Sequence, residues 1–227
     1  MKTNNSKEKV RQLQNKLYLT AKKCQKRRFH ALYDKVYRDD VLIEAWKRVK
    51  ANKGSSGVDG IRIEDIEKMG IEKYLKELKK ELIEGKYIPS PVKRVMIPKP
   101  DGSERPLGIP TVRDRIVQMA AKIAIEPVFE ADFRECSYGF RPKRSAKQAL
   151  EVVRKACNNK GYYVVDADIE KFFDNVNQDK LMILIEQRIS DRRILKLIRQ
   201  WMRSGILYGV IQQIKHCLFR HIKTGLL

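Results

Sequence analysis

Residues 162–176 have the sequence YYVVDADIEKFFDNV. The β-branched and aromatic start of this stretch predicts a short strand, in which the two valines and Ile169 anchor the chain in a sheet. Asp168 stands where the apolar run stops, so we expect its carboxylate to reach a solvent-filled cleft. Since side chains alternate along a strand, Asp166 shares a face with Asp168, whereas Asp174 is expected on the turn into the next helix.

The paired phenylalanines that follow these acids are a second signal. A strand that ends in a carboxylate beside a bulky aromatic is typical of the palm of a polymerase, where two metal ions about 3.5–4 Å apart need two or three carboxylates. One strand rarely supplies all of them. A strand end with solvated acids is the common alternative, and the bare Asp-x-x-x-Phe-Phe-Asp pattern favours it. The choice depends on the rest of the chain.

The size and charge of the chain narrow the class of partner. Its 227 residues include 42% hydrophobic side chains, which is enough to bury a core in one or two domains. The formal charge of +21 and the pI near 9.9 favour a polyanionic partner. Nucleic acid is the most favoured partner and an anionic membrane is the second. The membrane is less favoured because no apolar run approaches the roughly 18 residues of a spanning helix. The N-terminus lacks a signal-peptide core, so we expect a cytoplasmic protein without a membrane partner.

The cysteines indicate neither a disulfide framework nor a zinc site. Cys24, Cys136, Cys157 and Cys217 are scattered and form no Cys-x-x-Cys pair, so we expect reduced thiols. The His/Cys cluster in residues 216–221 lacks a fourth ligand for a metal.

Residues 1–38 carry much of the excess charge, with twelve basic side chains against two acidic ones. Leu13, Leu17, Leu32 and Val36 recur at helical spacing, which predicts one or two basic helices with a narrow apolar stripe. A solvated charged face is the alternative, but such a face would carry balancing acids. We therefore expect a phosphate-binding arm.

A glycine-rich loop follows the helix that we expect over residues 40–50. The loop, residues 52–60 (NKGSSGVDG), has a backbone that can approach a ligand closely. A flexible connector is an equally good interpretation of this composition. Residues 62–84 are expected to be helical and to end at Gly85, a suitable C-cap.

A β-hairpin is expected between residues 92 and 110. Two strand-like runs, VKRVMIP and RPLGIP, lie on either side of an Asp-Gly turn. Lys99 and Arg105 flank that turn. Two cations on a mobile hairpin can close over a triphosphate, although charges at a strand edge also deter aggregation.

The remaining segments are expected to be mostly helical. Residues 114–133 have apolar side chains at helical spacing and little polar surface, which predicts a buried helix. The stretch 137–142 (SYGFRP) mixes aromatics with a cation, which suits base stacking and phosphate contact but also the packing of a loop. A helix is expected over residues 145–157, and amphipathic helices are expected over residues 178–188 and 191–204.

Four blocks, in this order and spacing, resemble the fingers and palm of group II intron-encoded reverse transcriptases, the maturases. They are ANKGSSGVDG, VKRVMIPKPDGSERPLGIPTVRDRIVQ, CSYGFRP and VVDADIEKFFDNVNQDKL. The resemblance runs from about Leu13 to Gly205. It implies an α+β fold of reverse-transcriptase fingers and a partial palm, helix-rich with a small antiparallel sheet and a β-hairpin. The implied parts are a basic N-terminal helical region (1–50), fingers (51–160), a partial palm (161–208) and a divergent tail (209–227).

The resemblance also assigns roles to single residues. Asp168 looks like the first metal-binding aspartate of the palm, with the carbonyl of Ile169 as a further ligand, and Mg²⁺ is the implied cofactor. Phe173 resembles the aromatic gate that excludes a ribose 2′-hydroxyl. Lys99 and Arg105 match the cations that hold the triphosphate. The residues matched to template or RNA contacts are Asn52, Lys53, Gly54, Gly57 and Arg141.

The chain departs from this family in its last part. A Pro-Gln-Gly-Gly block and a Tyr-x-Asp-Asp hairpin, which brings two further catalytic aspartates, are expected, and neither occurs in the sequence. After Tyr208 the chain matches neither a thumb nor the helical RNA-binding domain of a maturase, which favours an altered, out-of-frame or truncated ending. A magnesium site that relies on one carboxylate is weak.

The sequence therefore predicts an incomplete reverse transcriptase domain that binds RNA and does not polymerise alone. The expected partners are intron RNA or an RNA template with a DNA primer, dNTPs in an intact enzyme, and a second copy of the chain in a homodimer. Three alternatives stay open: an active polymerase completed by a second chain, a non-catalytic RNA-binding module, and a fragment of another bacterial class such as the retron or diversity-generating reverse transcriptases.

Overall fold

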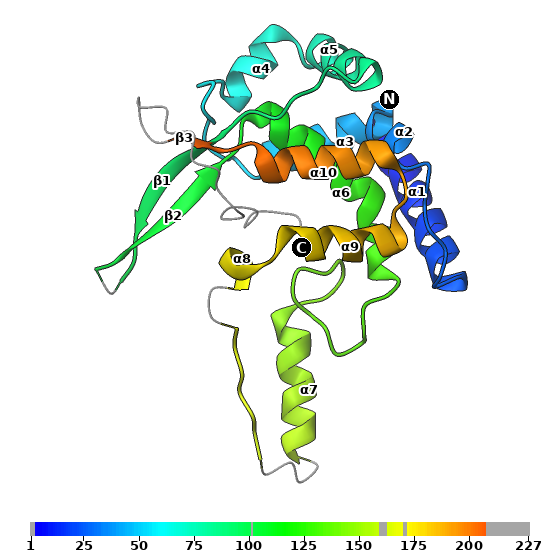
Figure 1. The fold of residues 1–227 in the computed structure, drawn as a ribbon, viewed down its shortest axis with the longest axis vertical. Helices are drawn as coiled ribbons and strands as arrows, with labels where there is room; N and C mark the ends of the chain where they lie inside the picture. Colours follow the sequence, from blue (N-terminus) through cyan, green and yellow to red (C-terminus); the bar gives the residue numbers. More distant parts are fainter. Residues whose placement is uncertain (1–2, 101, 159–162, 170–171, 208–227) are drawn as a thin grey trace.

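The computed structural model describes residues 3–100, 102–158, 163–169 and 172–207 (Figure 1). Its helices, in chain order, are α1 (Thr3–Lys23), α2 (Tyr33–Val36), α3 (Asp39–Ala51), α4 (Ile63–Met69), α5 (Ile71–Glu84), α6 (Val112–Glu130), α7 (Ala146–Asn158), α8 (Phe172–Asn175), α9 (Gln178–Arg188) and α10 (Arg192–Arg203). Its strands are β1 (Val92–Pro98), β2 (Glu104–Ile109) and β3 (Ile206–Leu207). The predicted helix-rich α+β fold is confirmed.

Helix α6 lies at the centre of the helical body. The buried helix predicted from its apolar spacing is confirmed, since Ile116, Ala120 and Ile123 are fully buried. Helices α1, α2 and α3 pack against it. Thr111 caps its start, because the Thr111 Oγ1 accepts a hydrogen bond from the Asp114 backbone N–H at 3.0 Å. A helix that is apolar on most sides needs neighbours on most sides, and α6 therefore organises the core.

The predicted basic N-terminal helices are also confirmed. Leu13 and Leu17 of α1 and Val36 of α2 belong to the core, as does Leu32 just before α2. The cationic side chains of α1 lie on its opposite, exposed face. Packing of this narrow apolar stripe, rather than local propensity, fixes α1 on the body.

The single helix predicted over residues 62–84 is wrong in one respect. Gly70 has a φ of +90°, which an α-helix does not accommodate, so the segment divides into α4 and α5. The predicted C-cap is confirmed, because Gly85 adopts the left-handed conformation with a φ of +69°.

The predicted hairpin forms one edge of a small sheet. Strands β1 and β2 are antiparallel, in a register that runs from Lys93↔Ile109 to Pro98↔Glu104. Strand β3 pairs with β1 in parallel, so the strand order is β2-β1-β3 and the sheet is mixed. The antiparallel sheet expected from the sequence is therefore found in the hairpin of β1 and β2, whereas the pairing of β3 with β1 is parallel.

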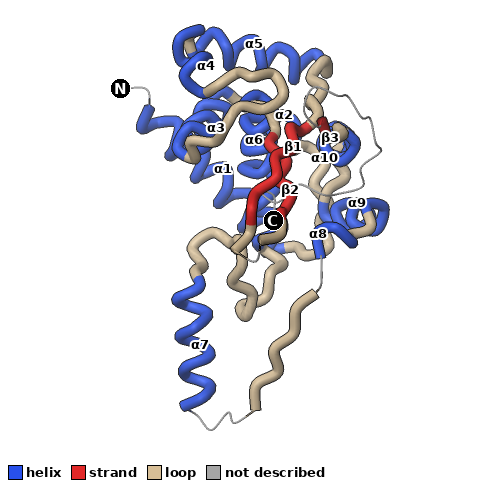
Figure 2. Tube along the Cα trace, turned by 90° about the vertical axis from the view of Figure 1, so that its left-hand side faces the viewer, coloured by secondary structure: helices blue, strands red, loops and turns tan. Residues whose placement is uncertain are grey.

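The strand predicted at the start of 162–176 is wrong for the residues that the structure describes. Tyr163–Ile169 is an extended segment outside the sheet, and the side chains of Tyr163 and Val165 are 97% and 92% exposed. Helix α7 likewise has no buried residue. Both segments project from the helical body (Figures 1 and 2). A strand is held by a partner strand and by packing on its face, and the described residues supply neither here.

Other predictions fall partly outside the described residues. Tyr162, the divergent tail and the His/Cys cluster lie outside them, whereas the backbone of Asp174 lies in α8. Cys24, Cys136 and Cys157 are free cysteines with exposed side chains. Within residues 3–207, gaps apart, no helix is long and apolar enough to cross a membrane.

The turn between α9 and α10 is anchored to the segment that follows α1. Phe29 and Ile189 form a parallel bridge, in which the Phe29 N–H donates to the Arg188 carbonyl at 2.8 Å. The Arg188 guanidinium caps the end of α1 by donating to the carbonyls of Ala21 and Cys24 at 3.2 and 3.3 Å. Segments about 160 residues apart in the chain are thus held together.

Candidate nucleotide and nucleic-acid interface

The hairpin brings the two predicted triphosphate-binding cations to one face. The Lys99 N–H donates to the Ser103 carbonyl at 2.7 Å and closes the turn. Arg105 pairs with Ile97 in the strand register. Because paired residues share a face and side chains alternate along each strand, Lys99 and Arg105 point to the same side. Both side chains are exposed, and no acid in the described part of the chain pairs with either.

The glycine-rich loop is seated on the start of α6. A Cβ added to Gly57 would lie 2.6 Å from both the Cα and the backbone nitrogen of Thr111, so only glycine allows this approach. A Cβ on Gly54 would collide with the guanidinium of Arg115. Gly57, one of the glycines predicted to face a ligand, is therefore also required for contact with the body, whereas at Gly54 the clash is with the flexible end of the Arg115 side chain. The loop is a fixed element, and Asn52 and Lys53 at its start are exposed.

Arg115 holds this loop, and the sequence analysis did not identify it. Its Nη2 donates to the Ser55 carbonyl, and its Nε is buried without a hydrogen-bond partner. Burial lowers the pKa of Arg115, against the opposing charge of Asp59. The sequence gives no signal for this role, because Arg113, Asp114 and Lys122 also interrupt the apolar pattern of α6.

Arg141 has a structural task in the loop between α6 and α7. Its Nη2 donates to Glu130 Oε1 at 2.7 Å, and its Nη1 donates to the carbonyls of Arg134 and Ser137 at 2.6 and 2.8 Å. The hydrogen bond to Glu130 raises the pKa of Arg141. The side chain is 4% exposed, so its N–H groups are committed within the protein. The RNA contact assigned to Arg141 stays a prediction, and its neighbours are better placed for it.

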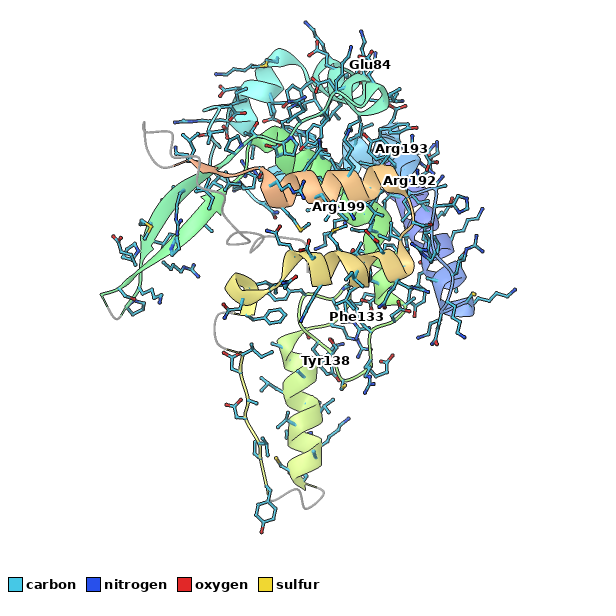
Figure 3. The ribbon with its side chains drawn as sticks, viewed as in Figure 1. Glu84, Phe133, Tyr138, Arg192, Arg193 and Arg199 are labelled. Atoms are coloured by element: carbon cyan, nitrogen blue, oxygen red, sulfur yellow. The ribbon has the colours of Figure 1, made fainter. Side chains whose placement is uncertain are left out.

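The aromatics of the same loop are the more accessible groups. Phe140 is 77% exposed and has a φ of +55°, an unfavourable conformation for a bulky side chain. The guanidinium of Arg144 lies 5.3 Å from the centre of the Tyr138 ring. Figure 3 shows Phe133 and Tyr138 in this loop, between α9 and the start of α7. Arg141 thus fixes a loop that presents aromatic and cationic side chains.

The acidic segment lies apart from the hairpin cations. Asp168 and Ile169 are exposed in the extended segment 163–169, and this segment and the hairpin project separately from the body (Figure 1). Phe173, in α8, is half-buried and stacks edge-to-face with Phe172 at a centroid distance of 5.3 Å. The predicted metal, gate and triphosphate residues therefore remain predictions as a joint site.

The donor chemistry fits magnesium only in part. Magnesium is bound by one or two carboxylates together with phosphate oxygens and water. Asp168 and Asp166 share a face of the extended segment, but no group of three His, Cys, Asp or Glu residues gathers among the described residues. Two ions bridging a phosphoryl centre need more oxygen ligands than this.

A comparison with known families gives the class of the protein. A family model described as "Reverse transcriptase (RNA-dependent DNA polymerase)" matches residues 97–226, which is more than half of the chain. The chain belongs to the reverse transcriptase family. Members of this family generally use divalent metal ions.

Individual relatives specify the branch of the family. The chain is 36% identical to Protein YkfC of Escherichia coli (strain K12) over 203 residues, which cover 86% of this chain and 53% of that protein. It is 34% identical to the group II intron-encoded protein LtrA of Lactococcus lactis subsp. cremoris, over 79% of this chain and 30% of LtrA. The resemblance to group II intron-encoded proteins is thereby confirmed. The chain spans about half the length, or less, of these relatives.

One solved structure, a partial Cas6-RT-Cas1–Cas2 complex, is also similar. The sequence identity is 20% and the TM-score is 0.47, over 83% of this chain and 31% of that one.

Proposed function

We propose that the chain is the fingers and part of the palm of an RNA-directed DNA polymerase of the group II intron maturase type, and that it binds RNA or a template–primer without polymerising alone. The observation that carries the proposal is the outer face of α1. Its apolar face is buried in the core, while Lys9, Arg11 and Lys16 are exposed, and Glu8 is the one acid in the helix. Such an unbalanced face suits a phosphate backbone.

The hairpin and the glycine loop support the same function. Lys99 and Arg105 share an exposed face on which a dNTP triphosphate could be held by charge-assisted hydrogen bonds. The loop from Asn52 to Gly57 is fixed by Arg115 at the start of α6, so it could order a template strand without rearranging first. Phe173 is proposed as the sugar gate and Asp168, with the Ile169 carbonyl, as the magnesium contact.

The expected lack of polymerisation follows from the acids. A phosphoryl-transfer site with two metal ions needs carboxylates from more than one strand, whereas the described residues bring together no group of three His, Cys, Asp or Glu side chains. A non-catalytic RNA-binding module is the second candidate, and the same observation favours it. The two candidates differ in whether Asp168 contributes to extension when a second chain supplies further carboxylates.

RNA binding is tested by filter binding of a labelled RNA across a salt series. We expect the logarithm of the association constant to fall steeply and linearly with the logarithm of salt concentration. The variant Lys9→Gln/Arg11→Gln/Lys16→Gln should reduce that slope. The control Lys73→Gln/Lys76→Gln/Lys80→Gln removes the same charge from α5 and should change it less. Binding that is indifferent to salt would refute the proposal.

Polymerisation is tested by primer extension with Mg²⁺ and dNTPs. We expect no extension by the chain alone. Extension that is abolished by Asp168→Ala and retained by Asp179→Ala, an exposed acid on α9, would show instead a polymerase that is active by itself.

A further inference from the structure

Helix α10 presents a stripe of four cations on its exposed face. Arg192, Lys196, Arg199 and Arg203 are four, three and four residues apart. At 3.6 residues per turn this spacing keeps all four within one narrow sector of the helix, over a length of about 16 Å. The opposite face, with Ile194, Leu195, Leu197, Trp201 and Met202, is buried in the core.

The stripe is not balanced by acids. The helix RRILKLIRQWMR contains none, and of the four cations Arg199 alone forms an ion pair within the described residues, with Glu186 of α9. Figure 3 shows Arg199 on the side of α10 that faces α9, and Arg192 at the start of the helix. Arg192, Lys196 and Arg203 are exposed, and no described acid pairs with them.

The position of Arg192 works against the stability of the helix. The first turn of a helix carries partial positive charge, so a cation there is unfavourable by a few tenths of a kcal/mol. Arg193, the other cation in that turn, is compensated: its guanidinium lies 4.9 Å from the centre of the Tyr33 ring and 3.9 Å from Asp191. Arg192 has no such contact within the described chain, so folding does not explain its charge.

A basic segment that follows α1 lies near the start of this stripe. The bridge between Phe29 and Ile189 sets the turn before α10 beside residue 29, directly after the basic residues 22–28. That segment contains exposed cations and no acid; they are Lys22, Lys23, Lys26, Arg27 and Arg28. Two basic segments far apart in the sequence therefore meet at one end of the molecule, where the turn before α10 lies beside α1 (Figure 1). We call the four α10 cations and this segment the α10 track.

We propose that the α10 track binds the phosphate backbone of a nucleic acid, as a second contact area besides the outer face of α1. This inference rests on the proposed RNA-binding function and deepens it. A stripe about 16 Å long spans roughly five nucleotide steps at about 3.4 Å of axial rise. A membrane surface suits the track less well, because an interfacial helix needs an exposed apolar face and that of α10 is buried.

The track is tested by fluorescence anisotropy of a labelled RNA with the full chain, titrated at several salt concentrations. The variant Arg192→Gln/Lys196→Gln/Arg203→Gln removes the three unpaired cations and keeps good helix formers. Each lost phosphate contact lowers the salt slope by about 0.7–0.9, so we expect a decrease of about 2 to 3 and an affinity weaker by about tenfold or more near 0.1 M salt. The control is again Lys73→Gln/Lys76→Gln/Lys80→Gln, which has the same net charge.

The outcomes separate this inference from the proposed function. If both triple variants weaken binding equally, net charge alone acts and the track is refuted, while RNA binding stands. The same holds if the α10 variant binds like the wild type. If the wild type binds no RNA, the proposed function and the track both fail. Tighter binding of anionic vesicles than of RNA, lost in the α10 variant, would assign the track to a membrane and also overturn it. Unchanged melting temperatures of the variants ensure that folding is not the cause.

Discussion

Asp191 is a buried carboxylate that joins the start of α10 to the start of α2. Its Oδ2 accepts hydrogen bonds from the backbone N–H groups of Leu32 and Tyr33 at 2.9 and 2.8 Å, and its Oδ1 caps α10 through the N–H of Arg193. Burial disfavours the charged form, but these backbone hydrogen bonds prevail and lower the pKa of Asp191. A single side chain thus fixes where α10 starts, and with it the α10 track.

Replacing Asp191 by alanine should lower the free energy of unfolding by about 3 kcal/mol, because buried N–H groups lose their acceptor and α10 loses its cap. Since the folded pKa is lowered, the stabilisation by Asp191 is present above the ordinary pKa of about 3.9 and is lost as the pH falls through the folded value. Urea unfolding at pH 7 and at acidic pH measures both effects. The deficit of the variant should shrink in acid. Glu77→Ala, an exposed acid on α5, is the control and should stay within about 0.5 kcal/mol of the wild type.

Ionisation of Tyr74 is expected to lower the stability of the folded protein at alkaline pH. Burial raises the pKa of Tyr74 to about 12, and burial also raises the pKa values of Tyr33 and Tyr87. Because the folded value of Tyr74 exceeds the ordinary value of about 10, its stabilisation is complete below pH 10 and is lost as the pH rises toward 12. We expect Tyr74→Phe to flatten this loss in thermal melts between pH 9 and about 12, and the exposed variant Tyr163→Phe to leave it unchanged. Equal curves for all three proteins would contradict the assignment.

At the scale of elements, the glycine loop depends on one close approach. An alanine at Gly57 would place its Cβ 2.6 Å from the backbone of Thr111, so the loop or the start of α6 must move. Overpacking of this kind costs about 1–3 kcal/mol. Gly57→Ala should therefore speed hydrogen exchange in residues 52–60 and weaken RNA binding. The matched control is Gly139→Ala, where a Cβ meets nothing within 4 Å. Unchanged exchange in the Gly57 variant would show that the loop is not held at this point.

The elements differ in how far the sequence could predict them. Helices α3, α6, α9 and α10 follow from local apolar spacing, and their observed bounds lie within a few residues of the predicted ones. The hairpin follows from its Asp-Gly turn. The break at Gly70 was missed because glycine tolerates a helix as well as a turn, and the conformation is set by packing. The segment 163–169 has the composition of a strand, but a strand also requires partners, which composition does not encode.

The candidate site shows the same limit. Lys99 and Arg105 could be placed on the same hairpin from the sequence, because a hairpin is formed by residues close in the chain. The structural role of Arg141 could not be predicted from the sequence, because its partner Glu130 belongs to another element and the motif alone suits RNA binding as well as packing. The role of Arg115 depends on its contact with the Ser55 carbonyl, and the α10 track depends on the bridge at Phe29. Both contacts join segments distant in the sequence, so the sequence alone does not predict them.

At the scale of the whole molecule, two described segments that project from the helical body, residues 163–169 and α7, expose apolar side chains (Figure 1). On the extended segment, Tyr163, Val165 and Ile169 share a face by the period of two, and all three are strongly exposed. On α7, Leu150 and Val153 are 69% and 55% exposed. An extended apolar segment with free backbone groups favours pairing with another chain. The charge of +21 opposes such association by repulsion between molecules.

This balance predicts self-association that increases with salt. Raising the ionic strength from 0.1 to 1 M shortens the screening length from about 10 to about 3 Å and removes the repulsion, while apolar contact persists. Sedimentation velocity should show a concentration-dependent shift at high salt, consistent with the homodimer expected from the sequence. Val165→Lys should suppress it without loss of stability, because that side chain is 92% exposed. Leu19→Lys, a comparable exposed apolar position on α1, should not. If both lysine variants associate as the wild type does, the contact lies elsewhere, and the extended segment is not the surface through which two copies meet.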